Sequence, residues 1–583
     1  MTTIDWVLAI GINVAIGVYA LSLARRTKSS TDFLLAARGL PWWIVGLATF
    51  ATAVDSGDYV VVAGGAYGFG LSNLTTWWLG LPLGWFLVSY FVFLPMYRSG
   101  VYTNAEWLEY RFGPFSRVVS AFIQLQFRTN VLGNVAWSIF LLFSIVGGVP
   151  DFWAWLLVVG IAGLAALYSA MGGLISGVFA DIPQWIAMAL GSFLLWIVVY
   201  LEVGGWSGLQ ERLAGLQDPD RPGDNLGWMM HVGATNQPGV PPTLVVYGFI
   251  VLLVSYNIVN HTQAMRFLAA RSEWDMKMGA LIASAIVVVV MFFNITLGII
   301  GRALRPNLEV VDQIFPLLLQ SYLPPVAVGL VVAGVIAAGV STFSSVGIAL
   351  SAVFTRDVYA RFIKRDGDDA HYLRVSKLLV PLIVASGFAY VPFLESGAFA
   401  FYVSLTSVFV MPLATVCLVG AFSRFHRGSG AVGLIVGSVY GVFAFVAGGG
   451  LEPLGIPGSD AVPIWLTDTW WTYLWAPVVT IASMALYSGW VTGKQGVVQD
   501  DDIAGLTYRT RDLLPDDLSR TAALRLDAIR GTWLEQTTAQ LERPPVYPFP
   551  VPEDGRLPWY KQDAALSGTF VAVMLFLCFI VLW

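Results

Sequence analysis

Apolar stretches long enough to cross a bilayer recur along the whole of this 583-residue chain. Hydrophobic residues make up 57% of the sequence and charged residues only 12%, and the mean hydropathy is +0.71. This composition excludes a set of soluble domains and predicts an all-α polytopic membrane protein. We count about 14 transmembrane helices, near 4–24, 41–69, 72–97, 115–147, 151–170, 173–204, 243–265, 277–301, 325–354, 372–396, 397–422, 430–448, 467–491 and 564–583.

The positions of Lys and Arg predict the orientation. They concentrate in alternate loops, and basic loops stay on the cytoplasmic side of a cell membrane, so the N-terminus and the C-terminus are both expected outside. Trp77 and Trp78 lie near a predicted span end, as interface anchors do. The predicted organisation is an extra span and inside linker (1–40), a first five-helix repeat (41–204), an outside loop (205–242), a second five-helix repeat (243–422), two additional spans (423–491), a cytoplasmic amphipathic and Pro-rich segment (492–563) and a C-terminal span (564–583).

Polar residues interrupt two of the predicted spans. Span 2 contains Asp55, Gly57 and Asp58, and span 7 contains the run from Ser255 to Gln263. Carboxylates and glycine in mid-membrane weaken a helix and are expensive to bury. Because spans 2 and 7 are five apart, the pattern predicts a 5+5 inverted-repeat core with broken helices in these two spans and a binding site at the midplane.

A cluster of hydroxyl residues lies in the span 325–354. Four hydroxyls fall within 341–345, three residues after Ala338. Hydroxyls at this spacing favour either close helix packing or an oxygen-rich site for a small hard cation. Asp181 lies at a depth of roughly 14 Å in span 6, counting ~1.5 Å per residue from the Gly172-Gly173 turn predicted before that span. An acid at that depth is a candidate functional residue.

At these residues the chain resembles the sodium:solute symporter family, whose members share the LeuT-type inverted-repeat core. The resemblance extends in order over roughly 30–430. It rests on 30–43, 105–112, 172–184, 257–272, 341–359 and 420–424. It implies Na⁺-coupled symport of a small organic solute by alternating access, with Na⁺ as the coupling ion and no other cofactor.

The resemblance also implies sodium ligands. The main site falls on the backbone carbonyls of Ala51, Val54 and Ala338 and on the hydroxyls of Ser341 and Thr342. Some members have a second sodium site, which falls here on Asp181, Ser341, Ser344 and Ser345.

The chain departs from the family at Asp55, Gly57 and Asp58, where members line the substrate pocket, usually with neutral or amide side chains. Two acids disfavour a sugar and suggest a cationic nitrogen on the substrate, or a proton-linked step. Arg128 faces the same pocket by resemblance and is suited to a carboxylate. We therefore favour an amino acid or another small zwitterionic or carboxylate nitrogenous compound. An internal pair between Arg128 and an acid is the structural alternative.

The broken span 7 supplies the remaining predicted substrate-binding residues, Tyr256, Asn257 and Asn260. The two amides have an alternative role, which is to satisfy an unwound backbone.

Enzyme chemistry is not indicated, because the chain has no phosphate-binding loop, zinc-ligand spacing or nucleophile elbow. The expected partners are the solute, Na⁺ and the lipid bilayer, and a net charge of −5 gives no sign of nucleic acid. Two other functions remain open. One is a proton-coupled carrier of the same fold, with Asp55 or Asp58 as proton site. The other is a transporter-derived membrane sensor, in which 492–563 contacts an unidentified protein.

Overall fold

The computed structural model describes most of the chain. Described are residues 1–23, 39–99, 101, 103–219, 221, 223–235, 237, 239–395, 397–459, 461–512 and 558–583, without the side chains of 20, 21, 23, 99, 172–185, 187–189, 192 and 369. The predicted amphipathic helix at 518–541 lies outside the described residues.

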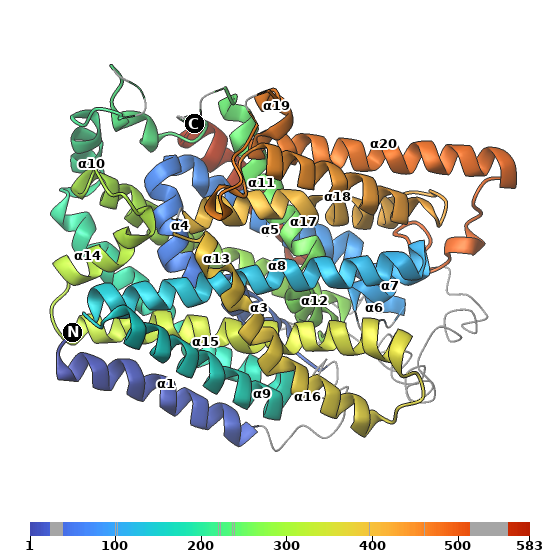
Figure 1. The fold of residues 1–583 in the computed structure, drawn as a ribbon, viewed down its shortest axis with the longest axis horizontal. Helices are drawn as coiled ribbons and strands as arrows, with labels where there is room; N and C mark the ends of the chain where they lie inside the picture. Colours follow the sequence, from blue (N-terminus) through green and yellow to red (C-terminus); the bar gives the residue numbers. More distant parts are fainter. Residues whose placement is uncertain are drawn as a thin grey trace.

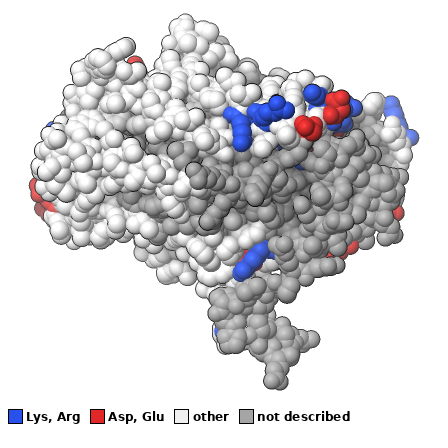
Figure 2. All heavy atoms as spheres, turned by 90° about the horizontal axis from the view of Figure 1, so that it is seen from below, with Lys and Arg blue, Asp and Glu red and all other residues white. Residues whose placement is uncertain are grey.

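The described residues form a bundle of helices, many of which run along the long axis of the molecule (Figure 1). Eleven of the described helices are long and apolar enough to cross a membrane, or up to 13 if each bent pair is one span. Among the described residues on the face shown in Figure 2, charged residues are sparse, as expected of a surface that meets lipid. The all-α polytopic fold class predicted from hydropathy is confirmed.

The bundle is built from the following helices. They are α1 (Thr3–Leu23), α3 (Trp42–Ala53), α4 (Ser56–Phe69), the span Thr76–Arg98 that contains α5 (Leu81–Leu87) and α6 (Phe93–Ser99), α7 (Asn104–Phe112), α8 (Pro114–Leu141), α9 (Asp151–Glu202), α10 (Gly205–Ala214), α11 (Pro242–Val259), α12 (His261–Leu268), α13 (Glu273–Leu304), α14 (Ile314–Tyr322), α15 (Ala327–Val353), α16 (Asp369–Ser386), α17 (Ala398–Phe422), α18 (Ser429–Ala447), α19 (Ile464–Thr467), α20 (Thr469–Gln495) and α23 (Asp563–Phe576).

One predicted boundary differs from the structure. The sequence predicts a turn at Gly172-Gly173 between two spans, whereas the backbone forms the single 52-residue helix α9. Glycine weakens a helix by about 1 kcal/mol relative to alanine but keeps its N–H donor, so two glycines need not end it. Of the about 14 spans that the sequence predicts, 11 are found as single helices in the described residues. The predicted span 4–24 is a shorter apolar helix over Thr3–Tyr19, 41–69 is the bent pair Trp42–Ala53 and Ser56–Asn73, and 173–204 is represented only by the bent pair Phe193–Glu202 and Gly205–Ala214.

Helix α15 lies at the centre of the arrangement that positions the site. It packs against α4, α8, α9 and α12. The chain between α3 and α4 is interrupted at Val54 and Asp55, and the chain between α11 and α12 is interrupted at Asn260. Both interruptions therefore lie among helices that contact one another in the interior of the bundle.

Both chain ends contact loops that the sequence assigns to the outside. The Val232 N–H donates to the Leu582 carbonyl over 2.6 Å, which joins the C-terminus to the loop 205–242. The Met1 ammonium donates to the Val146 carbonyl over 3.2 Å, beside the loop before α9. The termini thus lie on the same predicted side, and the assignment of that side to the outside stays a prediction.

Candidate functional site

The break between α3 and α4 is held open by its own acidic residues. Helix α3 ends at Ala53, and the two helices meet at an angle of 57°. The Asp55 Oδ1 atom accepts the backbone N–H groups of Gly57 (2.8 Å) and Asp58 (3.3 Å). In return, Asp58 Oδ2 accepts the Asp55 N–H over 2.7 Å. This reciprocal pair is a capping box that starts α4.

The capping box also releases a carbonyl of α3. In an uninterrupted helix the Asp55 N–H would bond to the Ala51 carbonyl. It donates to Asp58 instead, so the last bond of α3 is the one from the Val54 N–H to the Phe50 carbonyl, 3.1 Å. The freed Ala51 carbonyl lies at a helix C-terminus, which carries partial negative charge. Ala51 and Val54 are buried, so this negative end lies in the interior.

Helix α15 brings hydroxyls to the same break. Ala338, Ser341 and Thr342 are buried, and the Thr342 hydroxyl donates to Asp55 Oδ2 over 3.4 Å. The predicted main sodium ligands are thus contributed by two elements, the end of α3 and the middle of α15, that contact each other.

The residues predicted for a second sodium site are only partly placed. Ser344 is buried, and its hydroxyl has no hydrogen-bond partner among the described residues. The Ser345 hydroxyl is directed to the Thr342 carbonyl at 3.4 Å. The backbone of Asp181 is part of α9, and its side chain lies outside what the structure describes.

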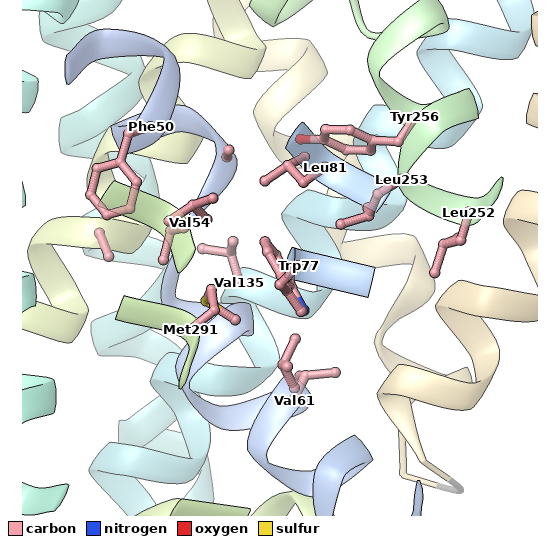
Figure 3. Packing of buried hydrophobic residues seen from close by; sticks show 14 of the residues in the cluster. Phe50, Val54, Val61, Trp77, Leu81, Val135, Leu252, Leu253, Tyr256 and Met291 are labelled. Atoms are coloured by element: carbon pink, nitrogen blue, oxygen red, sulfur yellow. The ribbon is translucent and has the colours of Figure 1, made fainter. Parts of the chain in front are cut away.

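A cavity of about 50 Å³ adjoins the break. Asp55 and Asp58 line it, together with Arg128 of α8 and Tyr256 of α11. Its apolar wall includes Trp77, Leu81, Leu252 and Leu253, whose side chains Figure 3 shows around Tyr256. Four of the predicted substrate-binding residues therefore share one cavity, although they come from three separate helices.

Arg128 is the most unusual group in this cavity. Its side chain is 1% exposed, its Nη1 donates to the Tyr256 hydroxyl over 3.0 Å, and its guanidinium carbon lies 5.5 Å from the centre of the Tyr256 ring. Its Nε and Nη2 atoms are buried and have no hydrogen-bond partner among the described residues. No ion pair within 4.0 Å joins Arg128 to Asp55 or Asp58 in the described structure. The guanidinium thus keeps two donors available.

The two remaining predicted residues, Asn257 and Asn260, lie outside the lining of this cavity. Asn257 Nδ2 donates to the Leu81 carbonyl over 3.0 Å, where a side chain on Gly84 would collide with it. Asn260 Oδ1 accepts the Thr262 N–H over 3.0 Å and so caps α12. Asn260 thus satisfies a backbone group at the second break, which is the alternative role that the sequence left open, whereas Asn257 bonds a carbonyl of α5.

The cavity also contains residues that sequence reasoning missed. Trp77 lines it, and Trp78, which was predicted to be an interface anchor with it, is buried and donates from its indole to the Val288 carbonyl over 2.9 Å. Proximity to a span end did not place these two side chains at the membrane interface, because the span Thr76–Arg98 is mostly covered by other helices. Asn134 and Tyr402 also line the cavity. Asn134 is an amide within a predicted span, a signal that could have identified it.

The sequence profile of the sodium:solute symporter family matches residues 33–437. The chain belongs to this family. Solute carrier family 5 member 4A of Mus musculus is 25% identical over 475 residues, covering 74% of this chain and 71% of that protein. Sodium/glucose cotransporter 1 of Oryctolagus cuniculus is 24% identical over 493 residues (76% and 72%), and sodium/myo-inositol cotransporter 2 of Bos taurus is 26% identical over 472 residues (74% and 68%).

Among solved structures, the chain is similar to the substrate-bound, outward-open state of a Na⁺-coupled sialic acid symporter. The TM-score is 0.67 at 18% identity, and the match covers 84% of this chain and 98% of that one. This likeness supports the fold. Family membership confirms the resemblance inferred from the sequence: the chain is a multi-pass membrane symporter, Na⁺ is its coupling ion, and its relatives are transporters rather than enzymes.

Proposed function

We propose that this symporter couples Na⁺ entry to uptake of a small solute that carries both a carboxylate and a cationic nitrogen. The observation that carries the proposal is the pair of unpaired, buried donors on Arg128, Nε and Nη2, in a cavity that Asp55 and Asp58 also line. Amino acids and related small nitrogenous acids have this pair of charges.

Burial makes the positive charge of Arg128 costly unless another group compensates it. An unpaired charge in a low-dielectric interior carries a penalty of several kcal/mol, and a carboxylate held by two parallel N–H donors removes most of it. A neutral polyol offers no such compensation. Asp58, which lines the same cavity, supplies a matching site for a cationic nitrogen, since it uses only Oδ2 in the capping box.

The sodium site that we propose is built at the break between α3 and α4. The carbonyls of Ala51, Val54 and Ala338 and the hydroxyls of Ser341 and Thr342 are hard oxygen donors suited to Na⁺. Two observations support it: the Asp55 N–H leaves the Ala51 carbonyl free, and Thr342 reaches the break at 3.4 Å.

Because one half of this site belongs to α3 and the other to α15, bound Na⁺ would hold the two helices together. Coupling requires that Na⁺ bind one state of the transporter more tightly than the other. We infer that Na⁺ favours the state ready to bind solute and that loss of Na⁺ to the cytosol loosens the bridge and releases the solute. In this scheme both termini lie outside.

A proton-coupled carrier is the second candidate, and the two carboxylates in one cavity favour it. Uptake into proteoliposomes separates the two. Radiolabelled amino acids, betaines, carboxylates and sugars are offered under an inward Na⁺ gradient at equal pH, and under an inward H⁺ gradient without Na⁺. We expect accumulation of a zwitterion in the first condition only. Accumulation driven by the H⁺ gradient alone would show that the coupling ion is H⁺ rather than Na⁺. Na⁺-driven accumulation of an uncharged sugar would refute the proposal that the solute is a zwitterion.

A further inference from the structure

The two oxygens of the Asp55 carboxylate have different surroundings. Oδ1 accepts both backbone N–H groups of the capping box. The contact of Oδ2 is with the Thr342 hydroxyl, at 3.4 Å, whereas O–H···O hydrogen bonds usually span about 2.5–3.0 Å. Oδ2 is therefore held beside a proposed sodium ligand without a strong hydrogen bond of its own.

The spacing of these two oxygens fits a shared cation. Ca²⁺, a hard cation close in size to Na⁺, binds oxygen at about 2.4 Å, and two ligands at right angles around such an ion lie about 3.4 Å apart. Thr342 Oγ1 and Asp55 Oδ2 are separated by that distance. The Val54 carbonyl directly precedes Asp55 in an extended stretch of backbone, so a carbonyl ligand and the carboxylate come from adjacent residues.

We propose that Asp55 Oδ2 is a direct ligand of the coupling Na⁺, so that this symporter binds its ion with a carboxylate in addition to carbonyls and hydroxyls. The inference rests on the proposed function. It gives Asp55 two roles in one side chain: Oδ1 starts α4, and Oδ2 binds the ion.

The charges in the cavity agree with this assignment. Asp55 is 7% exposed and has no ion pair within 4.0 Å among the described residues, although buried charges are normally paired. A Na⁺ bound at Oδ2 would supply the charge partner that the buried carboxylate lacks.

The test is Na⁺ binding to the purified full-length protein in the absence of solute. NaCl is titrated against choline chloride at constant ionic strength, and the thermal unfolding midpoint and the tryptophan fluorescence are recorded. Asp55→Asn keeps an acceptor oxygen for the capping box but loses the charge. We expect it to weaken the Na⁺ midpoint at least tenfold. The matched control, Glu309→Gln, removes an acid from an exposed position in the loop after α13 and should retain the parent midpoint.

A double-mutant cycle with Thr342→Ala tests whether the two residues bind one ion. If they do, the double variant loses less Na⁺ affinity than the product of the losses in the two single variants. The reason is that the second substitution acts on a site that the first has already disrupted. If the two losses of Na⁺ affinity simply multiply, the two residues act independently, and Asp55 is not a ligand of the ion that Thr342 binds.

The remaining outcomes are also decisive. If Asp55→Asn fails to fold, Asp55→Ser, which retains an N-cap acceptor, is measured in its place. A Na⁺ midpoint within twofold of the parent in whichever variant folds would overturn the inference and leave Na⁺ coupling intact. If the parent itself shows no response to Na⁺, the proposed function fails as well.

Discussion

Asp312 is a buried acid in the loop between α13 and α14, outside the spanning helices. Its Oδ2 accepts the Ala398 N–H (3.1 Å) and the Trp137 indole N–H (3.3 Å). Its Oδ1 has no hydrogen-bond partner among the described residues. Burial raises the pKa of Asp312 from 3.8 to about 7, because the ionised form loses its hydration and gains only these two donors.

The raised pKa sets the sign of a pH effect on stability. The unfolded chain releases the Asp312 proton near pH 4, whereas the folded protein keeps it to about pH 7. Folding therefore takes up a proton between these values, and the free energy of unfolding falls as pH rises through this window. The difference between the two pKa values corresponds to about 4 kcal/mol at full ionisation, which is an upper value for this site.

The perturbation is Asp312→Asn, which resembles the protonated acid in shape and keeps an acceptor for the Ala398 or Trp137 N–H. We expect the variant to be more stable than the parent at pH 8, by at most about 4 kcal/mol, and to match it near pH 4. The assay is the thermal unfolding midpoint of the detergent-purified protein between pH 4 and pH 8, with Glu309→Gln as the matched control. The same pH dependence in parent and Asp312→Asn would refute the reasoning.

Three further predictions concern the cavity and its surroundings. Ser341→Ala combined with Thr342→Ala should abolish Na⁺-stimulated uptake into proteoliposomes and leave membrane insertion intact; normal Na⁺ dependence would remove both hydroxyls from the ion site. Arg128→Lys keeps the charge but loses the planar pair of donors, so solute affinity should fall about tenfold or more while stabilisation by Na⁺ alone persists; an unchanged solute titration would contradict the assigned role. Gly64→Ala would place a Cβ 2.5 Å from Asp312 Oδ1 and 3.1 Å from its backbone, so a loss of about 1–3 kcal/mol is expected in the thermal midpoint, and a parent-like midpoint would show that the loop yields.

The sequence predicts the bundle because a bilayer imposes a minimum length on every apolar helix. The same constraint makes Asp55, Asp58 and Arg128 visible in sequence, since charges within spans are rare and need a reason. The structure places these three around one cavity, as the pattern suggested.

Local hydrogen bonding was the less predictable part. The sequence predicts both acids as substrate ligands, yet in the structure Asp55 and Asp58 also form a capping box, and Asn260 caps α12. Such roles depend on backbone geometry that forms only once the helix is broken. The merger of two predicted spans into α9 and the burial of Trp77 depend on neighbouring helices, which a hydropathy profile does not contain.

The central claim is that Na⁺ and a zwitterionic solute bind together at the break between α3 and α4. The most direct measurement is the thermal stability of the purified protein with amino acids, betaines, carboxylates, sugars and polyamines, each in NaCl and in choline chloride. A ligand that binds only the folded state raises the unfolding midpoint by mass action. We predict that a solute with both a carboxylate and a cationic nitrogen raises the midpoint in NaCl and not in choline chloride. An equal rise in both salts would contradict the account.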